Sequence, residues 1–332
     1  MKKLLVLLLA LVMVLGTCSA VAMAEEPLKI GYFGLAPTQA FFKEVYDSLE
    51  AACADRGYEL VGFYTDADPA EMRTAYEQFK AQGVDVIIDG NAYSDIMQPF
   101  AEQAVADGIP YIGLFVTFTD LPDAYTFGSS NRDMGIASGT FLGNTIAEEW
   151  DGQVDTILLV GTFASGVEIT ERLTVSAETI GTIVDTSNTE ILELNTDAGN
   201  ASTTYQVVAD ALTSHPNQKI VIVCQTDDIA NAAFSAVSAA GRDQDVIGTG
   251  NDCVDAALEY WQTAIKEDNM TVPWRGSIYL DTASYGGQLL DMTEAILAGT
   301  QEEHDVSPAP IIGGRTNWEE LWPDLMERDF AA

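Results

Sequence analysis

The sequence has little positive charge. Its 332 residues include 15 lysines and arginines against 51 aspartates and glutamates, which gives a formal net charge of −36 at pH 7. Such a chain repels the phosphates of nucleic acids and of anionic membranes, because both kinds of binding draw their affinity from basic patches. We therefore expect no nucleic-acid partner. We interpret the acidity as a source of solubility rather than as a cation-binding feature.

Histidine and cysteine are also scarce, which limits the chemistry available. The two histidines, His215 and His304, and the four cysteines form no CxxC or Cys/His cluster, so we expect neither a metal site nor a cofactor. A GxSxG motif and a GxxxxGK[ST] loop are missing too. The adjacent carboxylates of Asp227 and Asp228 point apart, whereas a glycosidase needs two that face each other at about 5 to 9.5 Å. A secreted sugar-acting enzyme is thus a distant alternative, and no catalytic residue is assigned.

Long hydrophobic runs are confined to the start of the chain. Residues 1–24 combine two lysines, an apolar run over 4–15 and the small-residue site Ala22-Met23-Ala24, the three parts of a secretory signal peptide. The run is too short to span a bilayer. Cys18 leaves a second interpretation open, a lipoprotein signal in which this cysteine is acylated. Both interpretations predict an extracytoplasmic protein, either periplasmic or at the cell surface.

Short apolar runs alternate with helix-like spacers through the rest of the chain. Four runs about 25 to 30 residues apart form a first series: KIGYFGL (29–35), YELVGFY (58–64), VDVIIDG (84–90) and IPYIGLF (109–115). A second series follows: DTILLVG (155–161), EILELN (190–195), KIVIVCQ (219–225) and DVIGTG (245–250). This alternation predicts an α/β fold with parallel sheets, and the length favours two domains. Parallel sheets bind ligands beyond the carboxyl ends of their strands.

Three cysteines follow the signal. Cys53 is expected on the first helix, and Cys224 and Cys253 just beyond two strand ends. Neighbouring parallel strands could bring the last two together. Buried thiols are favoured over a disulfide, and the choice stays open because the sequence does not give the geometry.

Several of these segments, in this order and spacing, resemble the type I periplasmic (solute) binding proteins of ABC importers, in particular the ribose and galactose group. The resemblance covers residues 29–299. Its most specific pieces are Phe41-Phe42, YELVGFYTDADPAEM (58–72), GVDVIIDG, GIPYIGL, the crossover from Ser130-Asn131 to Gly135, TSHP (213–216) ahead of KIVIVCQTDDIA, and VIGTGND (246–252).

The resemblance implies two Rossmann-like lobes with parallel sheets, joined by a three-strand hinge and closing on a ligand. The N-terminal lobe would comprise residues 25–130 and 281–310, and the C-terminal lobe residues 131–280 and 311–332. Such a protein is a monomer that captures a sugar-like solute and delivers it to an ABC permease complex in the membrane. A ligand-sensing partner of a membrane chemoreceptor or kinase has the same fold, so this alternative stays open.

The resemblance also implies a set of ligand-binding residues. Arg172 matches a second-lobe arginine that bonds sugar hydroxyls, although it could instead pair with Glu168 on an exposed helix. Phe41 and Phe42 match an aromatic platform, yet adjacent helix residues face different sides, so we expect at most one to meet the ligand. Asp227 could simply cap a helix. The full set is Gln39, Phe41, Phe42, Asn91, Phe115, Arg172, Thr226, Asp227, Asn251 and Asp252.

Four positions depart markedly from the ribose pattern. Phe115-Val116 stands where that pattern has an Asp-Arg pair, Gly250 displaces an aspartate, and Leu280 replaces a glutamine. Polar groups left unmatched in a closed cleft cost about 1 to 3 kcal/mol each. We therefore expect a ligand other than plain ribose.

Overall fold

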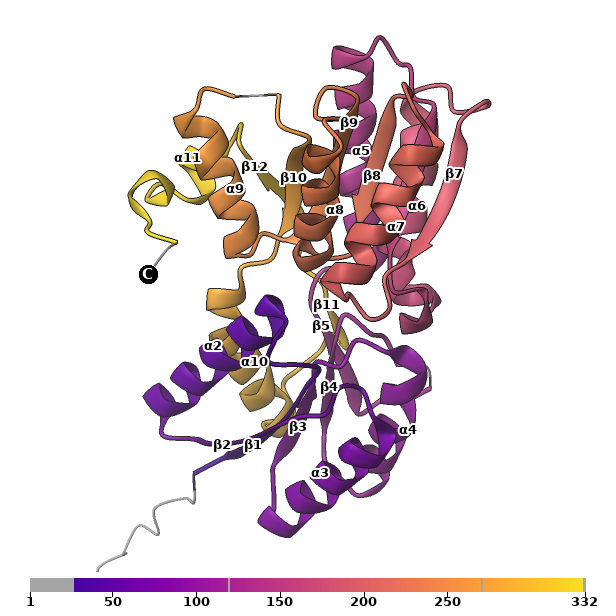
Figure 1. Cartoon of the computed structure of the whole chain (residues 1–332). Coiled ribbons are helices and arrows are strands. Elements are labelled where there is room, and N and C mark those ends of the chain that lie inside the picture. Colours follow the sequence, from indigo (N-terminus) through magenta and orange to yellow (C-terminus); the bar gives the residue numbers. More distant parts are fainter. Residues whose placement is uncertain (1–26, 119, 270, 331–332) are drawn as a thin grey trace, which may run out of the picture.

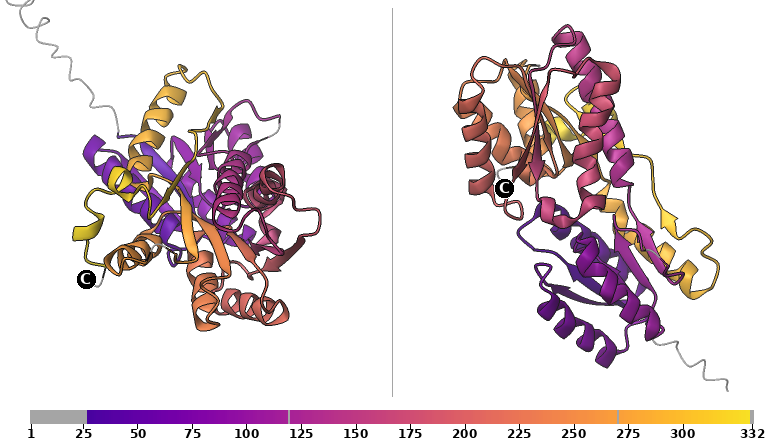
Figure 2. Two further views of the ribbon diagram at one scale, coloured as in Figure 1. Left: turned by 90° about the horizontal axis from the view of Figure 1, so that it is seen from above. Right: turned by 90° about the vertical axis from the view of Figure 1, so that its right-hand side faces the viewer.

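The computed structural model describes residues 27–118, 120–269 and 271–330. The chain forms two lobes, each with a central sheet between layers of helices (Figure 1). The lobes are stacked along the long axis of the molecule, as the right-hand view of Figure 2 shows. Within the described ranges, no helix is long and apolar enough to cross a membrane.

The first lobe contains a six-stranded, fully parallel sheet in the order β11-β5-β4-β3-β1-β2. Its strands are β1 (Lys29–Gly34), β2 (Glu59–Tyr64), β3 (Val86–Asp89), β4 (Tyr111–Leu114), β5 (Ala124–Phe127) and β11 (Asp305–Val306). Its helices are α2 (Ala40–Arg56), α3 (Pro69–Gln82), α4 (Ser94–Ala106) and α10 (Thr282–Leu297). The four runs of the first series thus form β1 to β4, as predicted.

The second lobe has a six-stranded sheet in the order β12-β10-β9-β8-β6-β7, in which only the β10–β12 pair is antiparallel. Its strands are β6 (Thr156–Gly161), β7 (Glu190–Asn195), β8 (Ile220–Cys224), β9 (Val246–Asp252), β10 (Trp274–Tyr279) and β12 (Ile311–Gly314). Its helices are α5 (Asn131–Glu149), α6 (Val167–Ile183), α7 (Ala201–Ser214), α8 (Asp227–Ala239), α9 (Asp255–Lys266) and α11 (Trp318–Leu321), with short 3₁₀ turns at Phe163–Ser165 and Leu325–Glu327.

The chain passes between the two lobes three times. The passages lie between β5 and α5, between β10 and α10, and between β11 and β12. After the second passage, α10 packs along α2 of the first lobe, where Arg56 bonds Asp291 at 2.6 Å and Glu294 at 2.5 Å. The first lobe is therefore built from two separate stretches of the chain.

Local signals in the sequence set the ends of the first two helices. The Asp68 carboxylate accepts a hydrogen bond from the backbone N–H of Ala70 at 2.7 Å, and Pro69 occupies the first turn of α3. Helix α2 ends at Gly57, whose φ of 72° suits glycine. At its other end, the side chain of Gln39 makes no capping hydrogen bond. The backbone N–H groups in the first turn of α2 therefore need hydrogen-bond acceptors from elsewhere in the protein.

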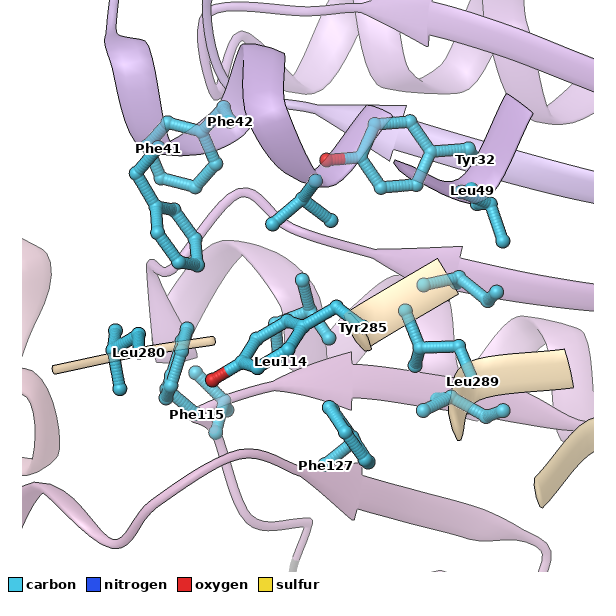
Figure 3. Packing of buried hydrophobic residues seen from close by; sticks show 14 of the residues in the cluster. Tyr32, Phe41, Phe42, Leu49, Leu114, Phe115, Phe127, Leu280, Tyr285 and Leu289 are labelled. Atoms are coloured by element: carbon cyan, nitrogen blue, oxygen red, sulfur yellow. The ribbon is translucent and has the colours of Figure 1, made fainter. Parts of the chain in front are cut away.

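The core of the first lobe extends to the boundary with the second. Phe41, Phe115, Tyr285 and Leu280 cluster there, as Figure 3 shows, and all four are buried. The three cysteines within the described ranges, Cys53, Cys224 and Cys253, are buried and free. The thiol interpretation is the correct one, and no disulfide joins Cys224 to Cys253.

Candidate functional site

A pocket lies between the two lobes, beyond the carboxyl ends of both sheets. Its empty volume is about 660 Å³, which includes space open to solvent. The first lobe contributes Leu35, Gln39, Phe41, Phe42, Ala92, Tyr93 and Phe115. The second lobe contributes Thr162, Ser165, Ile169, Arg172, Ala198, Gly199, Gln225, Thr226, Asp228, Ile229 and Asp252.

Aromatic rings form the wall contributed by the first lobe. The rings of Phe41 and Phe42 meet edge to face with centroids 5.2 Å apart, and Phe115 lies 5.6 Å from Phe41 (Figure 3). Both Phe41 and Phe42 line the pocket, although we expected at most one to reach it. Which of the two rings meets a ligand stays a prediction. These rings, inclined to one another, offer apolar faces and edges to a ligand.

Arg172 of α6 is the buried cation of the pocket. Its Nε and Nη2 donate to Asn131 Oδ1 at 3.0 and 2.7 Å, and its Nη1 donates to the backbone oxygen of Gln225 at 3.2 Å. The guanidinium also lies over the Phe115 ring, 5.6 Å from its centroid. A guanidinium has five N–H donors, so two are left for a ligand. Arg172 is held inside the pocket, not paired with Glu168.

Glu168 instead joins the two lobes. Its Oε1 accepts hydrogen bonds from the backbone N–H and the hydroxyl of Thr117, at 2.9 and 2.8 Å, and Thr117 belongs to the loop after β4. A second carboxylate reaches across as well: Asp228 of α8 accepts a hydrogen bond from the backbone N–H of Ala40, which supplies the cap that α2 lacks. The lobes are thus in contact around the pocket.

Two carboxylates of the second lobe line the pocket. Asp252 is only 6% exposed, and its φ of 116° is unusual for a residue other than glycine. Burial raises its pKa well above the usual range; Arg172 opposes this rise, and Asp228 and Glu44 add to it. Burial raises the pKa of Asp228 too, against the hydrogen bond from Ala40. Strained backbone of this kind persists where the surrounding structure enforces it, often at functional sites.

Seven of the ten predicted residues line the pocket, and three do not. Asn91 is fully buried within the first lobe, where its Oδ1 accepts from Thr65 and Ala67 and its Nδ2 donates to Asp89. Asp227 accepts from the Ser277 hydroxyl at 2.6 Å and from the Val254 N–H at 3.1 Å. Asn251 donates to the Cys224 carbonyl. The structure therefore gives these three side chains partners inside the protein. The seven are Gln39, Phe41, Phe42, Phe115, Arg172, Thr226 and Asp252.

Thr226 has a structural role besides its place at the pocket. Its hydroxyl accepts from the backbone N–H of Ile229 at 3.4 Å, so Thr226, and not Asp227, caps helix α8. Asp227 occupies the first position of that helix. The cap interpretation considered for Asp227 thus belongs to the residue before it.

Sequence reasoning missed several lining residues. Gln225 directly follows β8, and its side chain accepts from the Thr162 N–H and donates to the Ser165 hydroxyl at 3.2 Å. Both partners follow β6, so a signal was available: each residue stands just after a strand end, at the edge where parallel sheets bind ligands. Asp228 was considered only as a catalytic carboxylate beside Asp227, and Tyr93 was not considered.

Metal binding finds no support at this site. Across residues 27–118, 120–269 and 271–330, no group of three or more His, Cys, Asp or Glu side chains could hold a metal ion. The chemistry available is hydrogen bonding, stacking and charge pairing with an organic molecule.

Comparisons with known proteins agree with this architecture. Residues 30–301 match the periplasmic binding protein domain family. A Rhizobium meliloti protein named for binding rhizopine is 24% identical over 247 residues, 72% of this chain and 74% of that protein. A solute-binding protein of an ABC transporter from Bacillus halodurans C-125, solved with bound myo-inositol, superposes with a TM-score of 0.73 at 21% identity, covering 89% of this chain and 96% of that one.

A third similar protein has a different physiological setting. The fructose-binding periplasmic domain of a hybrid two-component system superposes with a TM-score of 0.75 at 18% identity, covering 90% of this chain and 95% of that one. The predicted fold class, two lobes with parallel sheets of the type I binding-protein kind, is confirmed. The chain therefore belongs to the periplasmic binding protein family, a family of extracytoplasmic binding proteins rather than enzymes.

Proposed function

We propose that this protein is the extracytoplasmic receptor of an ABC importer and binds a sugar or a sugar-like polyol between its lobes. The make-up of the pocket carries the proposal. One wall is aromatic, from Phe41, Phe42 and Phe115, and the opposite wall is polar, with Arg172 and Asp252. A sugar or cyclitol ring has C–H faces that stack on phenyl rings and an edge of hydroxyls that bond to such polar groups.

The known proteins support this class of ligand. Bound myo-inositol is named for one structural relative and fructose binding for another. A third similar structure, from Mycobacterium smegmatis, holds β-D-fucofuranose. These ligands are five- or six-membered rings rich in hydroxyls. In the same proposal, the protein acts by binding and release, without turning its ligand over.

We propose further that the two lobes move relative to each other by bending at the three chain connections between them. They would be residues 25–130 with 281–310, and residues 131–280 with 311–332. The support is that the passages between the sheets fall near Ser130, Asp281 and Pro310. Closure by bending at such connections encloses a ligand. We also propose that the protein is a monomer and that residues 1–24 are a signal peptide, or a lipoprotein signal in which Cys18 is acylated. Residues 1–26 lie outside the described part of the chain.

A ligand screen by thermal shift tests the function. A true ligand at about 100 times its dissociation constant stabilises the folded state by roughly 2.7 kcal/mol, which corresponds to a rise of several degrees in melting temperature. We expect such a rise with some sugars, furanoses or cyclitols. If amino acids or peptides raise the melting temperature and no polyol does, the ligand class is wrong. A bound sugar recovered chemically altered would contradict a pure binding role.

Sensing is the second candidate, because one structural relative is the periplasmic domain of a two-component system. The fold and the pocket are compatible with both roles. Deleting the gene should abolish uptake of the labelled ligand if the protein serves an importer. Uptake that persists while the transcriptional response to the ligand disappears would favour the sensor.

A further inference from the structure

The charges that line the pocket do not balance. Asp252 and Asp228 bring two carboxylates, and Arg172 is the one cationic side chain among the described residues that line it. Glu44, on α2 of the opposite lobe, adds to the negative potential felt by Asp252. The pocket lining therefore has more acidic than basic side chains.

Arg172 does not neutralise these carboxylates by direct contact. Three of its donors bind Asn131 and the carbonyl of Gln225, and its plane is covered by Phe115. Across the described part of the chain, the ion pairs within 4.0 Å include none to Asp252 or Asp228. Backbone N–H groups of Ala40 and Asp227 donate to Asp228 and Asp252, but no cation among the described residues touches either carboxyl group. A carboxylate buried without a cation is costly, and a cationic ligand can supply one.

We propose that the pocket prefers a polyhydroxylated ring bearing a protonated amino group, and that Asp252 and Asp228 bind this group. The inference rests on the proposed function and narrows its ligand class to amino sugars and aminocyclitols. Several features support it. An ammonium donates three hydrogen bonds and carries the charge that the two carboxylates lack. The net charge of −36 draws cations toward the protein at long range and repels anions.

Neutral sugars are the competing ligands, because carboxylates also accept hydrogen bonds from hydroxyls. The difference is quantitative. In a desolvated pocket, a hydrogen bond from an ammonium group to a carboxylate is stronger than one from a neutral hydroxyl to the same carboxylate. Replacing a hydroxyl of the ligand by an amine should therefore tighten binding roughly ten- to a hundredfold.

The test is calorimetric titration at pH 7 with matched pairs that differ by one amino group. The pairs are D-glucosamine with D-glucose, D-galactosamine with D-galactose, and an aminodeoxyinositol with myo-inositol. We expect the amine to bind more tightly in each pair that binds. Asp252→Asn should remove most of that preference, and Asp228→Asn serves as a second variant should the first fail to fold. Asp255→Asn is the control, because it removes an equal charge from an exposed residue outside the pocket lining.

The possible outcomes distinguish a failure of the amine preference from a failure of the proposed sugar-binding function. If the neutral sugar of every binding pair binds as tightly as its amine, the inference is overturned and the polyol receptor stands. An amine preference that survives both Asp252→Asn and Asp228→Asn would overturn the assignment to these carboxylates. If neither series binds and the thermal-shift screen finds no other polyol, the proposed function itself fails.

Discussion

Removing the carboxylate of Glu168 should weaken ligand binding although Glu168 is absent from the residues that line the pocket. Its Oε1 joins α6 of the second lobe to Thr117 of the first through two hydrogen bonds, at 2.9 and 2.8 Å. The Ser94 hydroxyl, also in the first lobe, lies 3.5 Å from Oε2. These contacts stabilise the arrangement in which the lobes meet. Glu168→Ala removes them and leaves the pocket lining unchanged.

The magnitude follows from the kind of bond that is lost. Hydrogen bonds to a charged group contribute about 1.5 to 3 kcal/mol, and the exposure of Thr117 puts this contact at the lower end. If closed and open forms exchange, the apparent affinity falls with the fraction of closed protein. A loss of about 1.4 kcal/mol then weakens binding about tenfold. Glu168→Gln keeps an acceptor and should lose less.

Titration calorimetry of the variants with the ligand found by the screen measures this effect. Glu171→Ala is the matched control: Glu171 lies on the same helix, and its carboxylate is 3.6 Å from Arg132, a residue of the same lobe. Small-angle scattering of the unliganded Glu168→Ala protein should also show a larger radius of gyration. Equal affinities for Glu168→Ala and Glu171→Ala would refute the reasoning, because the contact between the lobes would then contribute nothing to closure.

Three further predictions concern single side chains. Arg172→Lys should weaken binding almost as much as Arg172→Ala, by roughly ten- to a hundredfold in titration calorimetry, because lysine cannot bind Asn131 Oδ1 twice; unchanged affinity would remove Arg172 from the site. Gly250→Ala should lower the free energy of unfolding by about 1 to 3 kcal/mol in urea, because the methyl group would overlap Asp227 Oδ1; wild-type stability would contradict the packing. Burial raises the pKa of Asp89 to about 6. The stability that protonated Asp89 contributes is therefore fully present below its ordinary pKa of 3.8 and is lost as the pH rises through about 6. Melting curves of Asp89→Asn measured across this pH range should lack that part of the pH dependence.

The positions of most strands could be predicted from the sequence, and the reason is physical. Strands such as β3 and β8 are buried on both faces, so they appear as unbroken apolar runs that few other elements imitate. Strand β11 could not be found in this way. It has two residues, and only its pairing with β5 in space makes it a strand.

The pocket could be predicted in part. Phe115 and Arg172 were found because a family pattern marks their positions, but that pattern does not record which polar groups the protein itself occupies. Asn91 bonds Asp89 and Thr65, and this follows only from how the loops after β2 and β3 pack. Gly250 replaces an aspartate for a reason visible only in space, since the carboxylate of Asp227 fills the adjoining volume.

The passage of the chain through both lobes sets the order in which the molecule can fold. Helix α10 buries Leu289 and Leu290 against the first lobe, and β11 completes its sheet, yet both lie after residue 281. A ribosome that has made the first 130 residues has therefore made a lobe that still lacks an outer helix and an edge strand. The sheet of the second lobe is likewise incomplete until its edge strand β12 has been synthesised. Contacts between residues so far apart in sequence slow folding. We therefore expect the chain to stay unfolded until it is nearly complete, a delay that suits export across a membrane before folding.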